Sequence, residues 1–176
     1  FLSTLQTSQV SQLTSTQVQT LDTTQLQSLL TSQVAALDIG QVAALTTTQV
    51  RALTTDQLGA LSDTQVSALT TTQAQALSTT QIKSLKTAQI ESLSSTQMSA
   101  LTTTQLAAIT SLQAAAFESV DLVQLSTDQI KALTTAALTG LTSSQVSKLT
   151  NSQVGALTTD QAKALTTSQI VALTSA

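Results

Sequence analysis

Residues 53–60 read LTTDQLGA, and this eight-residue unit is the element from which the whole chain is built. We label its positions a to h. Leu stands at a, Ser or Thr at b and c, Gln at e, a branched apolar residue at f and Ala at h. The other repeats are this unit with small substitutions, so the fold has to be derived from it.

The repeat never loses its register. Position a recurs at every eighth place over 5–173, and it is Leu in every repeat except those with Ile109 and Phe117. Position e is Gln in 19 of 21 repeats, and Asp121 and Ala137 are the departures. A period this strict indicates a stacked array in which each unit contacts its neighbours. We therefore expect residues 1–176 to form one continuous array of 22 units.

An eight-residue period does not fit a long helix. Eight residues at about 100° each rotate the apolar stripe by roughly 80° per repeat, so no lasting face forms and a coiled coil is excluded. A β-solenoid is the alternative fold. It is disfavoured because Leu53 at a and Leu58 at f have opposite parity on a strand, and because Gly and Asn, the usual corner residues, are rare in this chain.

Short helices fit every repeat. The spacing of Thr54 and Gln57 is that of a capping box, in which the Thr hydroxyl accepts from the N–H of Gln57 and the Gln side chain accepts from the N–H of Thr54. Leu53 and Leu58 flank this box at the positions of a hydrophobic staple. Each repeat therefore predicts a helix of about six residues, from c to h. A helix this short is stable only when it is stacked against others.

We predict an all-α fold, an α-solenoid of very short helices with one helix per eight-residue repeat. Two weak patterns favour two helices, and so two repeats, per turn, because Leu at f falls mainly in one phase of a 16-residue period and the basic residues at g in the other. The basic residues are Arg51, Lys83, Lys131 and Lys163. The small Ala at h would let the helices approach closely.

The segment 109–124 is the one marked irregularity, because several positions change together while the count of eight is kept. Glu118 and Asp121 stand where the cap and its Gln partner are expected. As a functional site, Phe117, Glu118 and Asp121 would form a contact patch. As a structural feature, the segment would be a repacked joint with Phe117 in the Leu position, and we favour this second interpretation.

Composition excludes several classes of partner. Only 9% of residues are charged, 1% are aromatic and the net charge is −3, so the chain offers neither a basic patch nor stacking side chains for nucleic acid. No apolar run reaches the roughly 18 residues of a membrane-spanning helix. The sequence therefore predicts no nucleic-acid partner and no membrane-spanning segment.

The sequence offers no catalytic centre. There is no His or Cys, and the nine acidic residues are scattered through caps and outer positions. Asp56, Asp128 and Asp160 stand in the first helical turn, where a negative charge suits the helix dipole. A catalytic site needs converging acids, bases or nucleophiles, and a calcium loop needs clustered Asp residues. We therefore expect no enzyme, with no catalytic, cofactor-binding or metal-binding residue.

The consensus LTTxQVxA, as in residues 45–52 and, with Ala at f, residues 69–76, resembles the octapeptide tracts of long secreted and surface proteins of bacteria often described as adhesin-like. The resemblance covers the whole chain but carries no binding residue with it. It implies a component of an extracellular stalk, fibre or matrix at the bacterial cell surface.

The leading functional hypothesis is a structural rod whose partner is itself. Phe1 occupies position e and Ala176 position d, so a second copy would continue the register, and we expect head-to-tail stacking into filaments or a longer array of the same repeats. The alternative is an adhesin that presents a Thr-rich face to a glycan, to ice or to a protein. The commitment of the b hydroxyls to caps argues against that alternative.

The capping model gives a first prediction. Thr54→Ala should lower the free energy of unfolding by about 0.5–2 kcal/mol, because one helix loses its cap. Leu53→Ala should lower it by about 2–5 kcal/mol, because a buried side chain is lost. Thermal melting of both variants measures the difference, and negligible effects of both substitutions would rule out capped short helices.

Overall fold

The computed structural model describes residues 2–174, and within this range every residue in regular secondary structure is helical. Phe1 and Ala176, on which the expected end-to-end register was based, lie outside the described residues. The chain forms two compact units, Phe1–Leu85 and Lys86–Ala176. The predicted all-α fold with one short helix per repeat is confirmed, and the β-solenoid alternative is wrong for the described residues.

The α-helices of the first unit begin at intervals of eight residues, always at position c, and one 3₁₀ helix precedes them. They are the 3₁₀ helix η1 (Leu2–Thr4) and the α-helices α1 (Thr7–Val10), α2 (Ser15–Thr20), α3 (Thr23–Gln27), α4 (Thr31–Ala35), α5 (Ile39–Ala44), α6 (Thr47–Ala52), α7 (Thr55–Ala60), α8 (Asp63–Ser67), α9 (Thr71–Ala76) and α10 (Thr79–Ser84).

The second unit continues the same interval. Its helices are α11 (Thr87–Glu91), α12 (Ser95–Ala100), α13 (Thr103–Leu106), α14 (Ser111–Ala115), α15 (Ser119–Leu122), α16 (Thr127–Ala132), α17 (Thr135–Gly140), α18 (Ser143–Val146), α19 (Asn151–Gly155), α20 (Thr159–Ala164) and α21 (Thr167–Thr174).

The predicted capping box sets the start of each regular helix. At α7 the N–H of Gln57 donates to Thr54 Oγ1 over 3.1 Å, and the N–H of Thr54 donates to Gln57 Oε1 over 3.0 Å. At α4 and α11 the cap residues are Leu30 and Lys86, which supply no acceptor, so only the half made by the Gln side chain is present. Two backbone N–H groups that a helix start leaves without a partner are thus satisfied in the regular repeats.

The corner between successive helices is a pair of extended residues at a and b. Leu53 has φ −55° and ψ 134°, and Thr54 has φ −68° and ψ 160°. No described residue has a positive φ. The repeat therefore turns without the left-handed residue that commonly ends a helix, which explains why Gly is rare in this chain.

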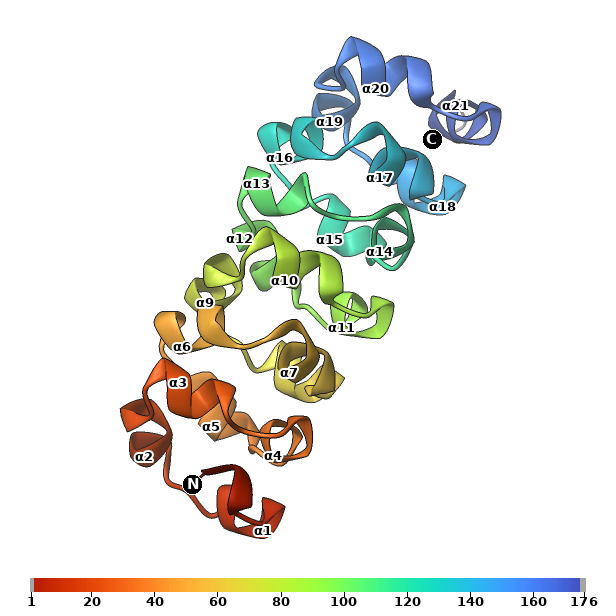
Figure 1. Cartoon of the computed structure of the whole chain (residues 1–176). Helices are drawn as coiled ribbons and strands as arrows, with labels where there is room; N and C mark the ends of the chain where they lie inside the picture. The colour runs from red at the N-terminus through yellow and green to blue at the C-terminus, as the bar shows by residue number, and fades with distance from the viewer. Residues whose placement is uncertain (1, 175–176) are drawn as a thin grey trace. The chain divides into compact units, whose positions relative to one another are not determined.

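Helices stack on the helix three positions later, not two. In the first unit α1, α4, α7 and α10 form one column, and Figure 1 shows α4 between α1 and α7. In the second unit α12, α15, α18 and α21 form another such column. One turn therefore contains three helices, or three eight-residue repeats.

The prediction of two helices per turn, with its 16-residue period, is wrong. Two helices joined by two residues would have to run antiparallel, and a reversal that sharp commonly requires a left-handed residue. The extended Leu-Thr corner turns the chain less sharply, so a third helix is needed to close the turn. Arg51 and Lys83, four repeats apart, thus lie on different sides of the solenoid, and the common phase of the basic residues is coincidental.

Three positions of each regular repeat point into the interior. In residues 53–60, Leu53, Gln57 and Leu58 are buried, while Thr54 is exposed and Asp56 lies at the surface. The same pattern of buried a, e and f recurs through the middle of each unit. The core of each turn is thus lined by Leu, a second apolar side chain and a Gln from every repeat.

Helices α14 and α17 make the most extensive contact of any pair in the second unit. Small residues allow it, because Ala114 occupies position f of α14 and Ala137 position e of α17, and both are fully buried. A Cβ on Gly140 would clash with the Ser111 carbonyl oxygen and lie 2.7 Å from the Ser111 Cα. Gly140 therefore permits the close approach, and its departure from the Ala consensus has a structural reason.

This contact gives a second prediction. Gly140→Ala should destabilise the protein by about 1–3 kcal/mol, because backbone atoms of α14 must shift to admit the methyl group. Gly155→Ala is the matched control, since a Cβ there has no neighbour within 4 Å. That variant should be neutral or more stable by up to about 1 kcal/mol. Urea unfolding of both proteins measures the difference, and equal midpoints would contradict the close packing.

Candidate functional site

A ladder of buried Gln side chains joins the turns of each unit. Gln57 Nε2 donates to the carbonyls of Leu26 at 2.9 Å, Gln27 at 3.3 Å and Leu29 at 2.8 Å, which precede it by 31, 30 and 28 residues. Its Oε1 meanwhile accepts from Thr54. One side chain thus completes the N-terminal cap of α7 and satisfies carbonyls at the C-terminal end of α3, one turn away.

The same arrangement recurs at the other regular positions. The residues that make these bonds to the turn before are Gln33, Gln41, Gln49, Gln65, Gln73 and Gln81 in the first unit, and Gln129, Gln145, Gln153, Gln161 and Gln169 in the second.

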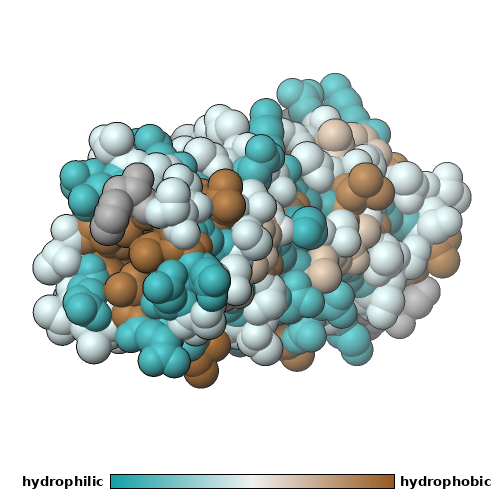
Figure 2. All heavy atoms as spheres, turned by 60° about the horizontal axis from the view of Figure 1, so that its bottom comes forward, coloured by the Kyte–Doolittle hydropathy of each residue, from teal (hydrophilic) through white to brown (hydrophobic). Residues whose placement is uncertain are grey.

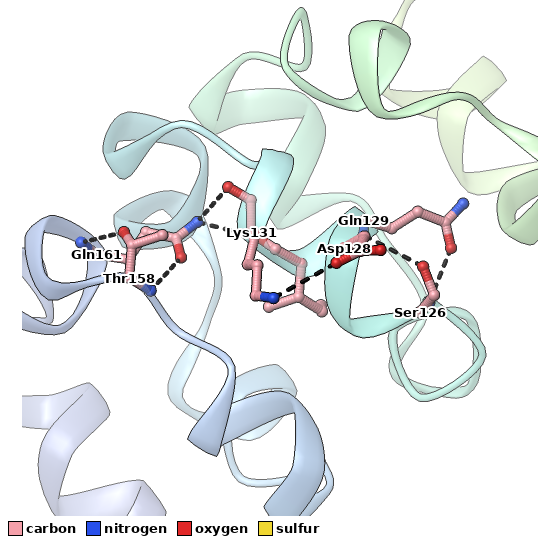
Figure 3. Close-up of polar contacts among 7 residues, drawn as sticks. Ser126, Asp128, Gln129, Lys131, Thr158 and Gln161 are labelled. Carbon is pink, nitrogen blue, oxygen red and sulfur yellow. Dashed lines mark hydrogen bonds and ion pairs between the residues drawn. The ribbon is translucent and has the colours of Figure 1, made fainter.

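Figure 3 shows one rung of this ladder in the second unit. Gln161 Oε1 accepts from the N–H of Thr158 at 3.0 Å, and Nε2 reaches the Lys131 carbonyl at 3.2 Å. Further bonds to the carbonyls of Ile130 and Leu133 are 2.9 and 2.7 Å long. A buried amide in which both the oxygen and the nitrogen are bonded stabilises its surroundings, whereas a partly satisfied one is costly.

Sequence reasoning assigned this Gln only half of its role. The local cap uses the amide oxygen, and the spacing of b and e reveals that bond. The two N–H groups bond to carbonyls in the turn before, which no short-range motif indicates. The available signal was an unused amide donor at every repeat, in a chain where other inward positions are apolar.

The ladder is interrupted twice in the second unit. Ala137 has no side-chain donor, so α17 is held to the turn before it by the close contact with α14. Asp121 stands at position e of α15 and is 1% exposed. Its Oδ1 accepts from the Ser95 hydroxyl at 2.6 Å, and its Oδ2 is buried without a hydrogen-bond partner.

The predicted contact patch of Phe117, Glu118 and Asp121 does not form one exposed surface. Phe117 is 4% exposed and fills the Leu position, as the repacked-joint interpretation expected, and Asp121 is buried. Glu118 is exposed but makes no side-chain cap to α15. The three side chains cannot act together on a partner, because two of them belong to the core.

The exposed apolar residues of the joint stand at position d. Leu112 is 74% exposed and Val120 58%. Val120 also lines an open recess together with Ser119, Val123 and Lys148. The exposed apolar residues of the joint are thus aliphatic, the recess beside Val120 carries one cation in Lys148, and buried Phe117 contributes nothing to either.

Charged side chains do not converge within residues 2–174. No group of three His, Cys, Asp or Glu residues is placed to hold a metal ion there. Lys131 and Asp128 form a solvent-exposed ion pair at 3.4 Å (Figure 3), a type that contributes little to stability. None of the described helices is long and apolar enough to cross a membrane.

Fold and ladder together define a helical-repeat solenoid protein. A family model named the ALTTAQ repeat matches the chain five times, at residues 34–71, 42–79, 75–111, 114–151 and 148–175. The matches cover most of the chain, so the chain belongs to the ALTTAQ repeat family. No curated protein matches it.

The ladder gives a third prediction. Gln57→Met should lower the free energy of unfolding by about 1–3 kcal/mol more than the loss of the local cap alone, because the buried Leu29 carbonyl loses its donor and the Leu26 carbonyl keeps only the bond from the N–H of Leu29. Gln25→Met is the matched control, since Gln25 is exposed and its side chain makes only the bond from the N–H of Asp22 among the described residues. Thermal melting compares the two variants, and equal losses would show that the bonds between turns contribute nothing.

Proposed function

We propose that the chain is a structural component of an extracellular or cell-surface fibre, stalk or matrix, built by stacking turns of this repeat on further turns of the same kind. The observation that carries the proposal is the complementarity of the two faces of a turn. One face presents Gln amide donors, and the other presents the carbonyls that accept from them. Any turn can therefore accept another copy of itself.

The first turn of the first unit presents the donor face. Gln9, Gln17 and Gln25 are exposed, and each accepts the capping bond through Oε1. Their Nε2 groups meet no acceptor within the described part of the chain. In the later turns of this unit, the same atoms donate to carbonyls of the turn before.

Apolar side chains accompany these donors. Leu5, Leu13 and Leu21 are half-buried, whereas Leu29 and the later Leu residues at a in this unit are buried. Figure 2 shows hydrophobic atoms gathered at the N-terminal end of the molecule. Covering such a face with another turn would remove apolar area from water, at about 25 cal/mol per Å².

The last turn of the second unit presents the acceptor face. At position f, Val154 is half-buried and Ala162 and Ile170 are exposed, whereas Val146 and the earlier f residues of this unit are fully buried. At the observed spacing of 31 residues between a Gln and its acceptor, the carbonyls of these residues would meet the Gln side chains of a following turn. The donors on one face and the acceptors on the other thus both recur every eight residues, so the two faces match.

The remaining surface supports a structural role. It is formed mostly by Ser, Thr and Gln side chains, and the b hydroxyls are bound in caps. Low net charge provides little repulsion between copies. The likeness of the octapeptide to tracts of bacterial surface proteins supports a place outside the cell, and the scattered acidic residues support a protein without an active site.

Stacking gives a fourth prediction. The protein should associate with increasing concentration in sedimentation velocity experiments, and electron microscopy should show filaments. The double variant Gln9→Glu/Gln17→Glu should weaken association at least about tenfold, because each carboxylate would face carbonyl oxygens in the contact. Glu serves in a capping box as Gln does, so the helices themselves should persist.

The variant Gln12→Glu/Gln19→Glu is the charge-matched control. Both residues are exposed and lie outside position e, so this variant should associate like the unaltered protein. A strictly monomeric protein at tens of micromolar, with the first and last turns protected from hydrogen exchange, would refute the stacking. Equal weakening by both double variants would show that net charge, rather than the donor face, governs association.

A further inference from the structure

The buried carboxylate of Asp121 is the one described side chain with a buried polar atom that has no hydrogen-bond partner. Asp121 is 1% exposed, and no Lys or Arg among the described residues forms an ion pair with it. An isolated buried carboxylate is costly unless it is paired, neutralised or bound to a metal ion. The structure therefore leaves this carboxylate without a partner that would offset the cost of its burial.

The repeat geometry identifies what faces Asp121. On both sides of it the register of eight is kept: Gln129 reaches the Leu101 carbonyl 28 residues earlier, and Gln153 reaches the carbonyls of Leu122 and Leu125 at 31 and 28 residues. The corresponding carbonyls for residue 121 are those of Ile90 and Leu93.

A Gln at position 121 would donate two N–H groups to these carbonyls, but a carboxylate has no N–H to donate. Asp121 Oδ2 therefore adds a further acceptor to a place that already holds acceptors. Ser95, the first residue of α12, donates to Oδ1 and leaves Oδ2 without a donor among the described residues. By the register of the repeat, Oδ2 would thus lie among acceptor oxygens, to which the N–H of Leu93 supplies one hydrogen bond, at the Ile90 carbonyl.

We propose that this place in the second unit is a cation site, in which Asp121 Oδ2 and the carbonyl oxygens of Ile90 and Leu93 bind a hard metal cation, and Ser95 orients the carboxylate. Carboxylate and backbone carbonyl oxygens are the ligands of Ca²⁺, and carbonyls at helix C-termini also coordinate Na⁺. The cation replaces the Gln amide: it joins α15 to the end of α11 as the amide joins the other turns.

This site differs from the kind that the sequence excluded. Within the described residues there is no cluster of carboxylates, and one carboxylate with backbone carbonyls leaves no spacing motif in the sequence. The signal is the single acidic residue in a column of Gln. The inference is independent of the proposed function, because it concerns the interior of the second unit and not the faces that would stack.

Thermal melting tests the proposal on the whole chain. The melting temperature is measured in choline chloride, whose cation is too large for the site, and in NaCl, KCl and CaCl₂ at matched ionic strength. At about ten times the dissociation constant, the bound cation should raise the melting temperature by about 3–6 °C. Calorimetric titration of CaCl₂ or NaCl into the protein in choline chloride should give one site per chain.

Asp121→Gln is the decisive variant, because it restores the consensus amide and keeps the fold. It should melt at the same temperature in all four salts and give no calorimetric binding. Asp160→Asn removes one charge from an exposed position of the same unit and should respond to the salts like the unaltered protein. This control separates the site from a general effect of charge.

The location is read from amide chemical shifts. Titration with the cation that binds should shift the amides of Leu93, Ser95 and Asp121 in the unaltered protein. Equal melting in all four salts, a salt response that persists in Asp121→Gln, or stabilisation by acid alone without any cation response would overturn the proposal.

Discussion

The fold depends on one side chain used twice. The Gln at position e closes the capping box of its own helix through Oε1 and donates through Nε2 to the carbonyls that end a helix of the turn before, as Gln57 does. The free energy of a six-residue helix is unfavourable in isolation. Because the same amide starts a helix and fixes it to its neighbour, local structure and stacking form together. This double use accounts for the unbroken register of eight residues in the chain.

The interior of each turn is accordingly partly polar. Buried polar groups that are fully satisfied specify one arrangement more strictly than apolar contacts do, because every alternative register leaves donors or acceptors without partners. Gln57 Nε2 reaches carbonyls 28, 30 and 31 residues earlier, and a turn of any other length would not place them there. The Leu and Val side chains supply most of the burial, while the amides fix the number of helices per turn.

This division explains what the sequence predicted. Helix starts were correct because the capping box links residues three apart, such as Thr54 and Gln57, and short-range chemistry determines it. The number of helices per turn was wrong because it depends on the bonds from Nε2 to distant carbonyls and on a corner, Leu53-Thr54, that is extended in both residues. The contact patch failed for a related reason. Phe117 and Asp121 were unusual by sequence, but residues at a and e point inward whatever their type.

The two departures at position e show what the ladder requires. Ala137 gives up the amide, and the helices compensate by approaching closely enough that Gly140 replaces the usual Ala against Ser111. Asp121 keeps a polar group at a similar position, but it places an acceptor where Gln has an N–H donor. Closer packing cannot compensate for the buried charge. Ala137 is therefore accommodated by apolar packing alone, whereas Asp121 leaves a buried charge without a partner. Since both lie in the same unit, where Gln129 and Gln145 keep their bonds to the turn before, the array tolerates a missing rung where its neighbours are intact.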